Sequence, residues 1–262
     1  MLRFIACILF VFISFNLKAQ TWELGGAVGG AGYIGDLNQL NPAKVSGIAV
    51  SAFVKRNFDG YLSAKLNYAF GIISAADSNS SSAQLRARNL SFTTTLFEVS
   101  VIGEFNFMKY IPDVSKSIFT PYIYLGVGAL NYYPSTVYNG QKYGVRGYET
   151  EGESKPYPVT ALTIPYGVGV KYNVLGKWTI AADIGYRYTN TDYLDDVSGN
   201  YPNKNANSPI SAALSDRSGE KTGVYIGAPG SQRGDGNPHD TYFFAQVSLS
   251  FTFVTQKCYF ER

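Results

Sequence analysis

Two neighbouring stretches of the chain, residues 164–172 and 178–188, alternate between apolar residues and polar or small ones. In the second stretch Trp178 and Ile180 share one parity, whereas Asp183 and Arg187 share the other. Successive side chains of a strand point to opposite faces, so the pattern predicts strands with one apolar and one polar face. Such strands fit either a soluble β-sandwich or a membrane β-barrel, which turns its apolar face to lipid.

The same alternation recurs along the chain and predicts eight strands. They span residues 22–33, 45–56, 61–73, 90–107, 119–131, 164–172, 178–188 and 241–254. In the fourth strand the apolar parity changes after Phe92, and we interpret the change as a bulge near residues 93–95, because one extra residue restores the phase. The outward-facing set is predicted to include Leu66, Phe70, Ile180, Ile184, Val247 and Leu249.

The predicted connections alternate between short turns and longer loops. The turns are residues 57–60, 108–118 and 173–177, and the long loops are residues 34–44, 74–89, 132–159 and 189–240. Outer-membrane barrels have short periplasmic turns and longer outer loops. Sandwich strands are usually about five or six residues long, which is shorter than these. The pattern therefore predicts an all-β, eight-stranded antiparallel transmembrane β-barrel of the outer membrane, with both termini in the periplasm and the long loops outside.

The N-terminal segment has the features of an export signal. Arg3 precedes an apolar run at residues 4–15, and the small residue Ala19 follows. We therefore predict a signal peptide at residues 1–19 and a single barrel domain at residues 20–262. After cleavage Cys258 is the one remaining cysteine, and it cannot form an internal disulfide.

Composition agrees with an outer-membrane barrel. The chain has 21 Tyr, 17 Phe and 27 Gly, and only 16% of its residues are charged. Aromatic residues form girdles at both lipid–water interfaces of such barrels. The sequence has no run of basic residues, so nucleic acid is not an expected partner. Outer-membrane lipid is expected around the barrel, and no cofactor or small-molecule substrate is indicated.

The polar face of the strands carries charged residues. An eight-stranded barrel is too narrow for an open pore, so its interior is filled by side chains. The alternation places these charged residues inside: Lys65, Glu98, Glu104, Lys171, Asp183 and Arg187. Buried charges are tolerated when they are paired and hydrogen-bonded, so we expect a network of salt bridges that locks the barrel. A proton or ion path is the alternative interpretation.

Residues suited to catalysis are sparse. His239 is the only histidine, and a lone histidine beside Asp240 is a weak basis for general acid–base chemistry. Metal-ligand spacing of Cys and His is missing from the sequence. Asp192, Asp195 and Asp196 do not have the spacing of a known calcium loop, which favours a solvated acidic loop. We therefore predict neither an enzyme nor a metal site.

Several passages together resemble one protein family. They are Tyr-Ile-Gly-Asp-Leu-Asn at residues 33–38, Thr-Glu-Gly-Glu at 150–153 and Thr-Asp-Tyr-Leu-Asp-Asp-Val-Ser-Gly-Asn-Tyr at 191–201, together with 164–172 and 184–187. The chain resembles the PorG-like outer-membrane proteins of Bacteroidota, which are barrel components of the type IX secretion (gliding-associated) machinery. The resemblance covers essentially the whole mature chain. It implies a non-enzymatic barrel that ties periplasmic ring subunits to the outer membrane and is not the translocation pore.

The resemblance leaves a second class of function open. The chain could be a stand-alone small barrel, either an adhesin-like surface protein or a lipid- or peptide-modifying barrel enzyme. If it is a secretion component, the ring subunits are expected to contact the turn at residues 108–118 and the C-terminal tail, which mix aromatic, aliphatic and charged groups. The expected contact residues are Lys109, Tyr110, Ile111, Asp113, Lys116, Cys258, Tyr259 and Phe260.

Overall fold

The computed structural model describes residues 21–39, 41–202 and 208–254. The predicted signal peptide at residues 1–19 lies outside these ranges, as do the expected contact residues Cys258, Tyr259 and Phe260.

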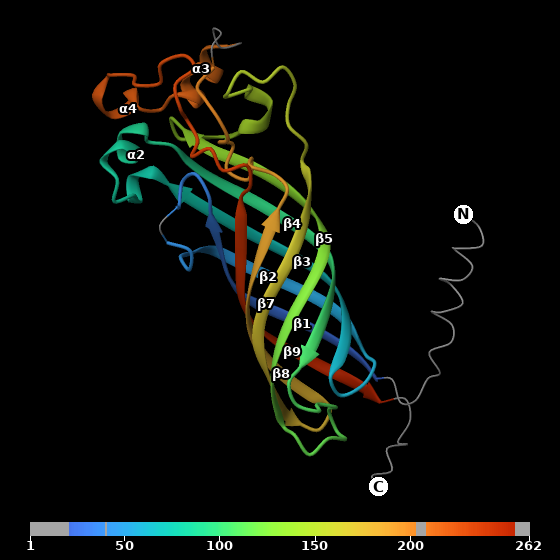
Figure 1. Cartoon of the computed structure of the whole chain (residues 1–262). Coiled ribbons are helices and arrows are strands. Elements are labelled where there is room, and N and C mark those ends of the chain that lie inside the picture. Colours follow the sequence, from blue (N-terminus) through green and yellow to red (C-terminus); the bar gives the residue numbers. More distant parts are fainter. Residues whose placement is uncertain (1–20, 40, 203–207, 255–262) are drawn as a thin grey trace, which may run out of the picture.

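Eight long antiparallel strands close into a barrel (Figure 1). They are β1 (Thr21–Ile34), β2 (Val45–Asn57), β3 (Leu62–Ala76), β4 (Ser91–Asn106), β5 (Phe119–Tyr138), β7 (Thr160–Leu175), β8 (Trp178–Thr189) and β9 (Thr241–Val254). Neighbours in the chain pair with each other around the ring, and β1 pairs with β9 to complete it. Closure gives every strand two partners, as the backbone of a protein in lipid requires. The predicted fold is confirmed.

Side chains of the predicted outward set lie on the outer surface of the barrel. Leu66, Ile180, Val247 and Leu249 are exposed, although each is apolar. This band is the lipid-facing surface that an outer-membrane barrel needs, and it makes the chain a small outer-membrane β-barrel. Among the described residues, none of the helices is long and apolar enough to cross a membrane.

Strand β5 extends beyond its predicted end into the segment expected to be a loop. Its last residues form a hairpin with the short strand β6 (Gln141–Gly144). Asn139 and Gly140 make the turn with φ of 47° and 77°. An Asn-Gly pair is a strong hairpin signal because both central residues of the favoured turn need positive φ. The loop predicted at residues 132–159 is therefore wrong in its first part, and β3 likewise extends into the loop predicted at 74–89.

The bulge predicted near residues 93–95 is wrong. Strand β4 pairs with β3 in one unbroken register from Leu62↔Phe105 to Ala76↔Ser91. Phe92 and Leu96 point into the barrel and are buried, whereas Val99 points outward. The apolar parity changes because the interior itself turns from polar to apolar toward one end of the barrel.

The two ends of the barrel differ (Figure 1). The short-turn end carries the connections at residues 58–61, 107–118 and 176–177. The long-loop end carries a folded cap, made of the described parts of residues 35–44, 77–90, 139–159 and 190–240. The cap contains β6 and the short helices η1 (Asp77–Asn79), α2 (Ala83–Arg88), η2 (Val145–Tyr148), α3 (Pro209–Ser215) and α4 (Gly219–Thr222).

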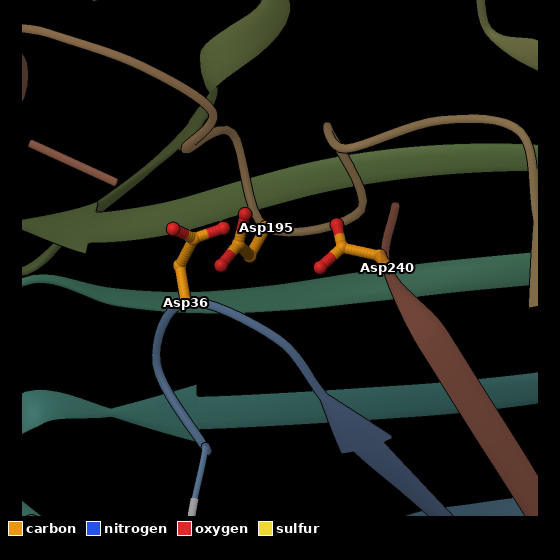
Figure 2. Close-up of side chains that lie close together, drawn as sticks. All are labelled: Asp36, Asp195 and Asp240. Carbon is orange, nitrogen blue, oxygen red and sulfur yellow. The ribbon is translucent and has the colours of Figure 1, made fainter. Parts of the chain in front are cut away.

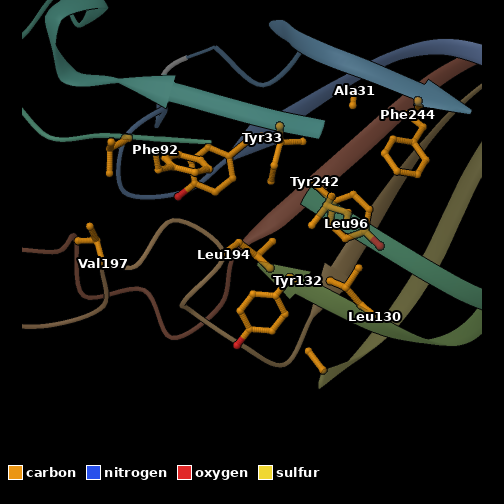
Figure 3. Close-up of a cluster of buried hydrophobic side chains, with 14 of the residues drawn as sticks. Ala31, Tyr33, Phe92, Leu96, Leu130, Tyr132, Leu194, Val197, Tyr242 and Phe244 are labelled. Carbon is orange, nitrogen blue, oxygen red and sulfur yellow. The ribbon is translucent and has the colours of Figure 1, made fainter. Parts of the chain in front are cut away.

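An apolar core lies where the cap meets the barrel (Figure 3). Tyr33 from β1 packs edge-on against Phe92 from β4, with ring centroids 4.8 Å apart. Leu194, from the segment between β8 and β9, is fully buried in the same cluster. Its backbone carbonyl accepts a hydrogen bond from the Thr94 hydroxyl. The cap is thus packed into the mouth of the barrel by apolar contacts.

Candidate functional site

The interior near the short-turn end is organised around Glu104 of β4. Its carboxylate lies 2.7 Å from the Lys171 ammonium, 2.9 Å from that of Lys65 and 3.6 Å from that of Lys55. Lys55 also pairs with Glu23 at 2.8 Å. Two acids and three bases therefore share one buried network, and each charge has an opposite partner within salt-bridge distance.

Strand register explains why the network needs both acids. Glu23 stands directly opposite Lys55 on β1 and β2, and Lys55 stands opposite Lys65 on β2 and β3. Two like charges that face each other across strands are destabilising. The Glu104 carboxylate, which reaches both lysines, offsets that repulsion. The ammonium of Lys171 also lies 4.3 Å from the centroid of the Tyr122 ring, a favourable cation–π distance.

A second pair occupies the middle of the lumen. The Arg187 guanidinium lies 3.3 Å from the Glu98 carboxylate, which also accepts a hydrogen bond from the Tyr242 hydroxyl at 2.7 Å. Asp183 accepts a hydrogen bond from the Tyr124 hydroxyl at 3.1 Å. Within the described part of the chain, Asp183 has no lysine or arginine within salt-bridge distance. Its hydrogen-bond donor is therefore a tyrosine hydroxyl rather than the positively charged side chain that was expected.

All six charges predicted to face the lumen do so: Lys65, Glu98, Glu104, Lys171, Asp183 and Arg187. Glu23 and Lys55 complete the network. The alternation of the second strand places Lys55 on the inner face, but the predicted set of network charges omitted both residues. Glu23 lies between Trp22 and Leu24, which face outward, so the alternation of β1 did place it inside. The many glycines of that strand obscured the signal.

The turn at the short-turn end closes the barrel. Tyr110 and Ile111 are each only 3% exposed. The Tyr110 hydroxyl hydrogen-bonds the Thr179 hydroxyl at 2.7 Å, and its backbone N–H donates to the Gly60 carbonyl. These two side chains are therefore not available to a partner, contrary to the prediction. Lys109, Asp113 and Lys116 are exposed on the same turn.

The three loop passages that carry the family resemblance meet in the cap. The Tyr33 hydroxyl donates to Asp195 at 2.6 Å, which joins residues 33–38 to residues 191–201. Glu151 accepts hydrogen bonds from the backbone N–H groups of Ser198 and Gly199, both at 3.0 Å, which joins residues 150–153 to the same passage. The resemblance therefore corresponds to one buried structure rather than to separate loops.

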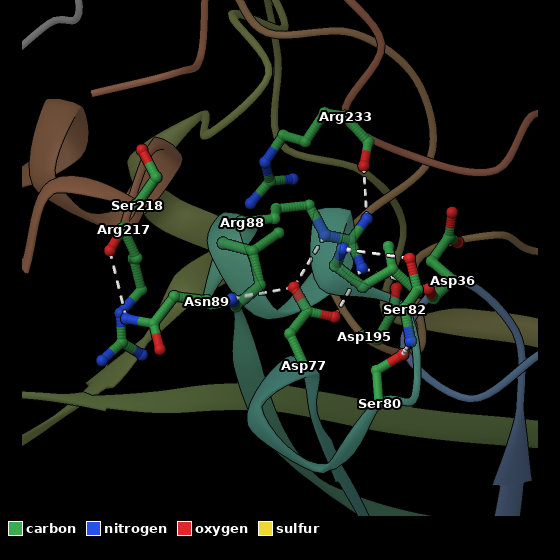
Figure 4. Close-up of polar contacts among 12 residues, drawn as sticks. Asp36, Asp77, Ser80, Ser82, Arg88, Asn89, Asp195, Arg217, Ser218 and Arg233 are labelled. Carbon is green, nitrogen blue, oxygen red and sulfur yellow. Dashed lines mark hydrogen bonds and ion pairs between the residues drawn. The ribbon is translucent and has the colours of Figure 1, made fainter. Parts of the chain in front are cut away.

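Two buried arginines link the cap segments to one another (Figure 4). Arg88 donates to both carboxylate oxygens of Asp77 at 2.7 and 2.8 Å, and to the backbone carbonyls of Asp36 and Arg233. Arg233 donates to Glu151 at 2.9 Å. Each guanidinium thus joins segments that are far apart in the sequence, and these charge-assisted bonds are stronger than neutral ones.

The cap also contains a cluster of three buried carboxylates (Figure 2), two of which, Asp36 and Asp195, are drawn with Arg88 in Figure 4. One ligand oxygen from each of Asp36, Asp195 and Asp240 lies within 4.8 Å of the others. Burial raises the pKa of Asp36 to about 7. Burial, followed by the negative charges of neighbouring carboxylates, raises the pKa of Asp195 and of Asp240 well above the usual range.

The solvated acidic loop predicted from Asp192, Asp195 and Asp196 is wrong, because all three side chains are buried. Asp196 does not join the cluster. It accepts hydrogen bonds from the hydroxyls of Thr150 at 2.7 Å and Tyr157 at 2.6 Å. Spacing along one loop could not reveal the cluster, because Asp36 comes from another loop and Asp240 lies at the far end of the long connection that contains Asp195.

Comparison with known proteins identifies a family. The chain belongs to the family described as a domain of unknown function (DUF6089), which matches residues 2–214. No curated protein matches the chain.

Several solved outer-membrane proteins are similar to this DUF6089 chain at low identity. Neisserial surface protein A is 12% identical, with a TM-score of 0.42. A major outer membrane protein from Thermus thermophilus is 11% identical, with a TM-score of 0.45. The attachment invasion locus protein Ail of Yersinia pestis is 10% identical, with a TM-score of 0.41. Each comparison covers 90% of this chain and 100% of the other.

His239 of this DUF6089 chain lies exposed at the rim of the cap. Its ring packs against Tyr188, with centroids 4.9 Å apart. The carboxylate of the adjacent Asp240 accepts hydrogen bonds from Tyr33 and from the Leu194 N–H at 2.9 Å each. Asp240 is therefore engaged in the cap and does not orient His239 as the carboxylate of a catalytic pair does.

Proposed function

We propose that this barrel is a non-enzymatic, PorG-like component of the type IX secretion machinery of Bacteroidota, which anchors or assembles a periplasmic ring complex at the outer membrane. The observation that carries the proposal is the interior, which is filled by paired charges and closed at both ends. A filled barrel suits an anchor better than a conduit. The resemblance of residues 33–38, 150–153 and 191–201 to that family supplies the identity of the machinery.

Three layers of side chains support the anchoring role over a channel role. The turn carrying Tyr110 and Ile111 covers the short-turn end. The network around Glu104 occupies the lumen above it. The apolar core that includes Leu194 fills the opposite mouth. A protein substrate in transit needs an aqueous path, and eight-stranded barrels of this kind fill their interior with side chains.

The proposal places the ring contact on the short-turn end, which would face the periplasm. Exposed residues of the 108–118 turn include Lys109, Asp113 and Lys116. Buried Tyr110 and Ile111 hold the backbone of this turn against the barrel, so the charged side chains are presented on a fixed support. Preorganised side chains lose less conformational entropy when a partner binds.

A pull-down from the native outer membrane tests this function. The wild-type chain is expected to retain periplasmic ring subunits, and cells that produce it secrete cargo normally. The double variant Lys109→Glu/Lys116→Glu should fold, lose the ring subunits and reduce secretion. Replacing the whole turn is unsuitable, because it removes Tyr110 and Ile111 from the barrel end.

The matched control changes two exposed lysines of the cap, Lys142→Glu and Lys221→Glu. This variant is expected to retain the ring subunits. If the wild-type chain brings down no ring subunits and its deletion leaves secretion normal, the secretion role is wrong. If the cap control loses the ring subunits while the turn variant keeps them, the contact lies on the long-loop end.

A further inference from the structure

We propose that Asp36, Asp195 and Asp240 bind a Ca²⁺ ion that fastens the cap to the mouth of the barrel. Asp36 follows β1, Asp240 immediately precedes β9, and Asp195 belongs to the long segment between β8 and β9. An ion held by all three would join two neighbouring barrel strands to the loop that covers them (Figure 2).

The spacing of the carboxylates matches the size of the ion. One ligand oxygen of each residue lies within 4.8 Å of those of the other two. Calcium–oxygen distances are about 2.3–2.6 Å, so two oxygens on opposite sides of one Ca²⁺ ion stand about 5 Å apart. The three carboxylates are therefore close enough to share an ion without a rearrangement of the cap.

A separate observation points to a ligand at this place. The Oδ2 atom of Asp36 is buried and has no hydrogen-bond partner, although the Asp36 side chain is only 1% exposed. Its Oδ1 atom accepts a hydrogen bond from the Asp235 N–H. Figure 2 shows the Asp36 carboxylate reaching toward Asp195. A buried carboxylate oxygen without a donor is costly, and a bound cation would satisfy it.

The charge around the cluster is also unbalanced. Within the described ranges, none of the three carboxylates has a lysine or arginine within salt-bridge distance. The nearby Arg88 is committed to Asp77 and to backbone carbonyls. The single hydroxyl proton of Tyr33 serves two carboxylates, with oxygen–oxygen distances of 2.6 and 2.9 Å to Asp195 and Asp240. The Tyr33 hydroxyl is neutral, so the negative charge of the cluster is balanced either by bound protons or by a cation.

The chemistry of the ligands selects a hard cation. The candidate ligands are carboxylate oxygens, with the Tyr33 hydroxyl oxygen beside them, and neither sulfur nor imidazole belongs to the cluster. Ca²⁺ accepts irregular sets of oxygen ligands from loops, whereas Mg²⁺ demands near-ideal octahedral geometry and retains several waters. Zinc and copper sites favour cysteine and histidine. We therefore favour Ca²⁺ over these other ions.

Terbium luminescence and calorimetry on the full chain folded in detergent micelles test the site. Tyr33 hydrogen-bonds two of the proposed ligands, so tyrosine excitation should sensitise bound Tb³⁺, and Ca²⁺ should displace it. The wild-type chain should bind Ca²⁺ saturably at about 1 mM or below, as extracellular calcium modules do. Asp36→Asn should weaken Ca²⁺ binding about tenfold or more, because it removes one charged ligand.

Glu220→Gln is the matched control, because Glu220 is an exposed cap acid whose side chain lies outside the cluster and contacts Arg217 and Asn89. It should bind Ca²⁺ as the wild type does. Limited proteolysis gives a second readout. Ca²⁺ should protect residues 190–240 of the wild-type chain from cleavage and should protect them less in Asp36→Asn. Heat-modifiability on a gel reports whether each variant retains a folded barrel.

Two results would overturn the proposal. The first is a folded wild-type chain that shows no saturable Ca²⁺ binding at up to about 10 mM, a concentration well above the dissociation constants of calcium modules. Bound protons would then be what balances the charge of the cluster. The second is unchanged Ca²⁺ affinity in Asp36→Asn. The wild-type titration decides the question even if a variant of Asp195 or Asp240 fails to fold.

Discussion

Near the short-turn end, Glu104 lies within salt-bridge distance of three lysines, whereas at the long-loop end Asp36, Asp195 and Asp240 lie together without a basic partner in the described ranges. Both groups are buried. In the first, the protein itself supplies the opposite charge. In the second, the opposite charge has to come from solution, as protons or as a cation. The two ends of one barrel therefore differ in how their stability responds to the medium.

The barrel interior is expected to be insensitive to solution conditions, whereas the attachment of the cap is expected to depend on them. Paired charges inside the strands hold the barrel in one register, and removing one partner leaves the other buried and uncompensated. The cap is joined to the barrel by apolar packing and hydrogen bonds, and its acidic cluster makes that attachment sensitive to conditions. Segments that move or bind ligands are commonly the less stable ones.

The largest effect is expected from Glu104→Gln. The change leaves Lys55, Lys65 and Lys171 with Glu23 as their remaining acidic partner in the network. We expect the free energy of unfolding to fall by about 3–5 kcal/mol, the usual cost of breaking a buried ion pair. Urea unfolding in lipid vesicles measures it.

The exposed acid Asp113 supplies the control for Glu104→Gln. Asp113→Asn should leave the unfolding midpoint within experimental error, because Asn also tolerates the positive φ of 66° at this position. Equal unfolding midpoints for the two variants would show that the network does not hold the barrel together.

A charge placed on the lipid-facing surface of the barrel provides a reference cost in free energy with which the effects of the interior variants can be compared. Val247→Lys places an ammonium on the lipid-facing surface of β9 and should cost about 2–4 kcal/mol if the position lies near the bilayer midplane. Val137, on the part of β5 that extends to the cap, is equally exposed. Val137→Lys should cost far less in vesicles, and equal costs would contradict the placement of the lipid-facing band.

Arg187→Met should have a smaller effect than Glu104→Gln. It removes the base that pairs with Glu98, but the Tyr242 hydroxyl still donates to that carboxylate. We expect a loss of about 1.5–3 kcal/mol, typical of a hydrogen bond to a charged group. The double variant Glu98→Gln/Arg187→Met should recover part of the loss, because neither charge is then left alone. A double variant whose loss of stability exceeds the summed losses of the two single variants would contradict the pairing.

The smallest effect is expected from pH and concerns the cap. Burial raises the pKa of Asp192 to about 7, and the charges of Asp36, Asp235 and Glu151 also raise it. A carboxyl whose pKa is raised by folding stabilises the fold below its ordinary pKa and loses that contribution as pH rises through the raised value. In a calcium-free buffer, the protection factors of the cap amides, which correct for the intrinsic acceleration of exchange with pH, should therefore fall between about pH 4 and about pH 7.

The Asp192→Asn variant isolates this contribution, because its side chain does not titrate. Its cap should lose less protection over the same range of pH than the wild-type cap does. Exchange in the barrel strands serves as the internal reference. An identical pH profile for variant and wild type would show that Asp192 does not govern the response.

Alternation along the strands was enough to predict the barrel and six of the charges that face its lumen, although the predicted set omitted Glu23 and Lys55. It predicts the side of the sheet on which a residue lies, but not its partner across the barrel. Asp183 illustrates the limit, since it bonds a tyrosine rather than a base. The apolar parity of β4 misled the prediction because Phe92 and Leu96 belong to an interior core that the cap creates.

The cap could not be predicted from local pattern. Tyr33 and Asp195 are 162 residues apart in the sequence, and Tyr33 and Asp240 are 207 apart. Polar residues in long connections predict solvated loops, whereas in this chain many of the polar side chains of the cap are buried against one another. Tyr110 and Ile111 show the same limit at the other end, because an exposed turn and a turn that covers a barrel mouth have the same composition.

Electrical recording in a planar lipid bilayer tests most directly the claim that this barrel is a filled anchor rather than a conduit. The folded wild-type chain, inserted as a single species, is predicted to give no discrete conductance steps, because its lumen is occupied and both ends are covered. Reproducible steps of one size from the folded wild-type chain would contradict the account, because they require a continuous aqueous path through the barrel.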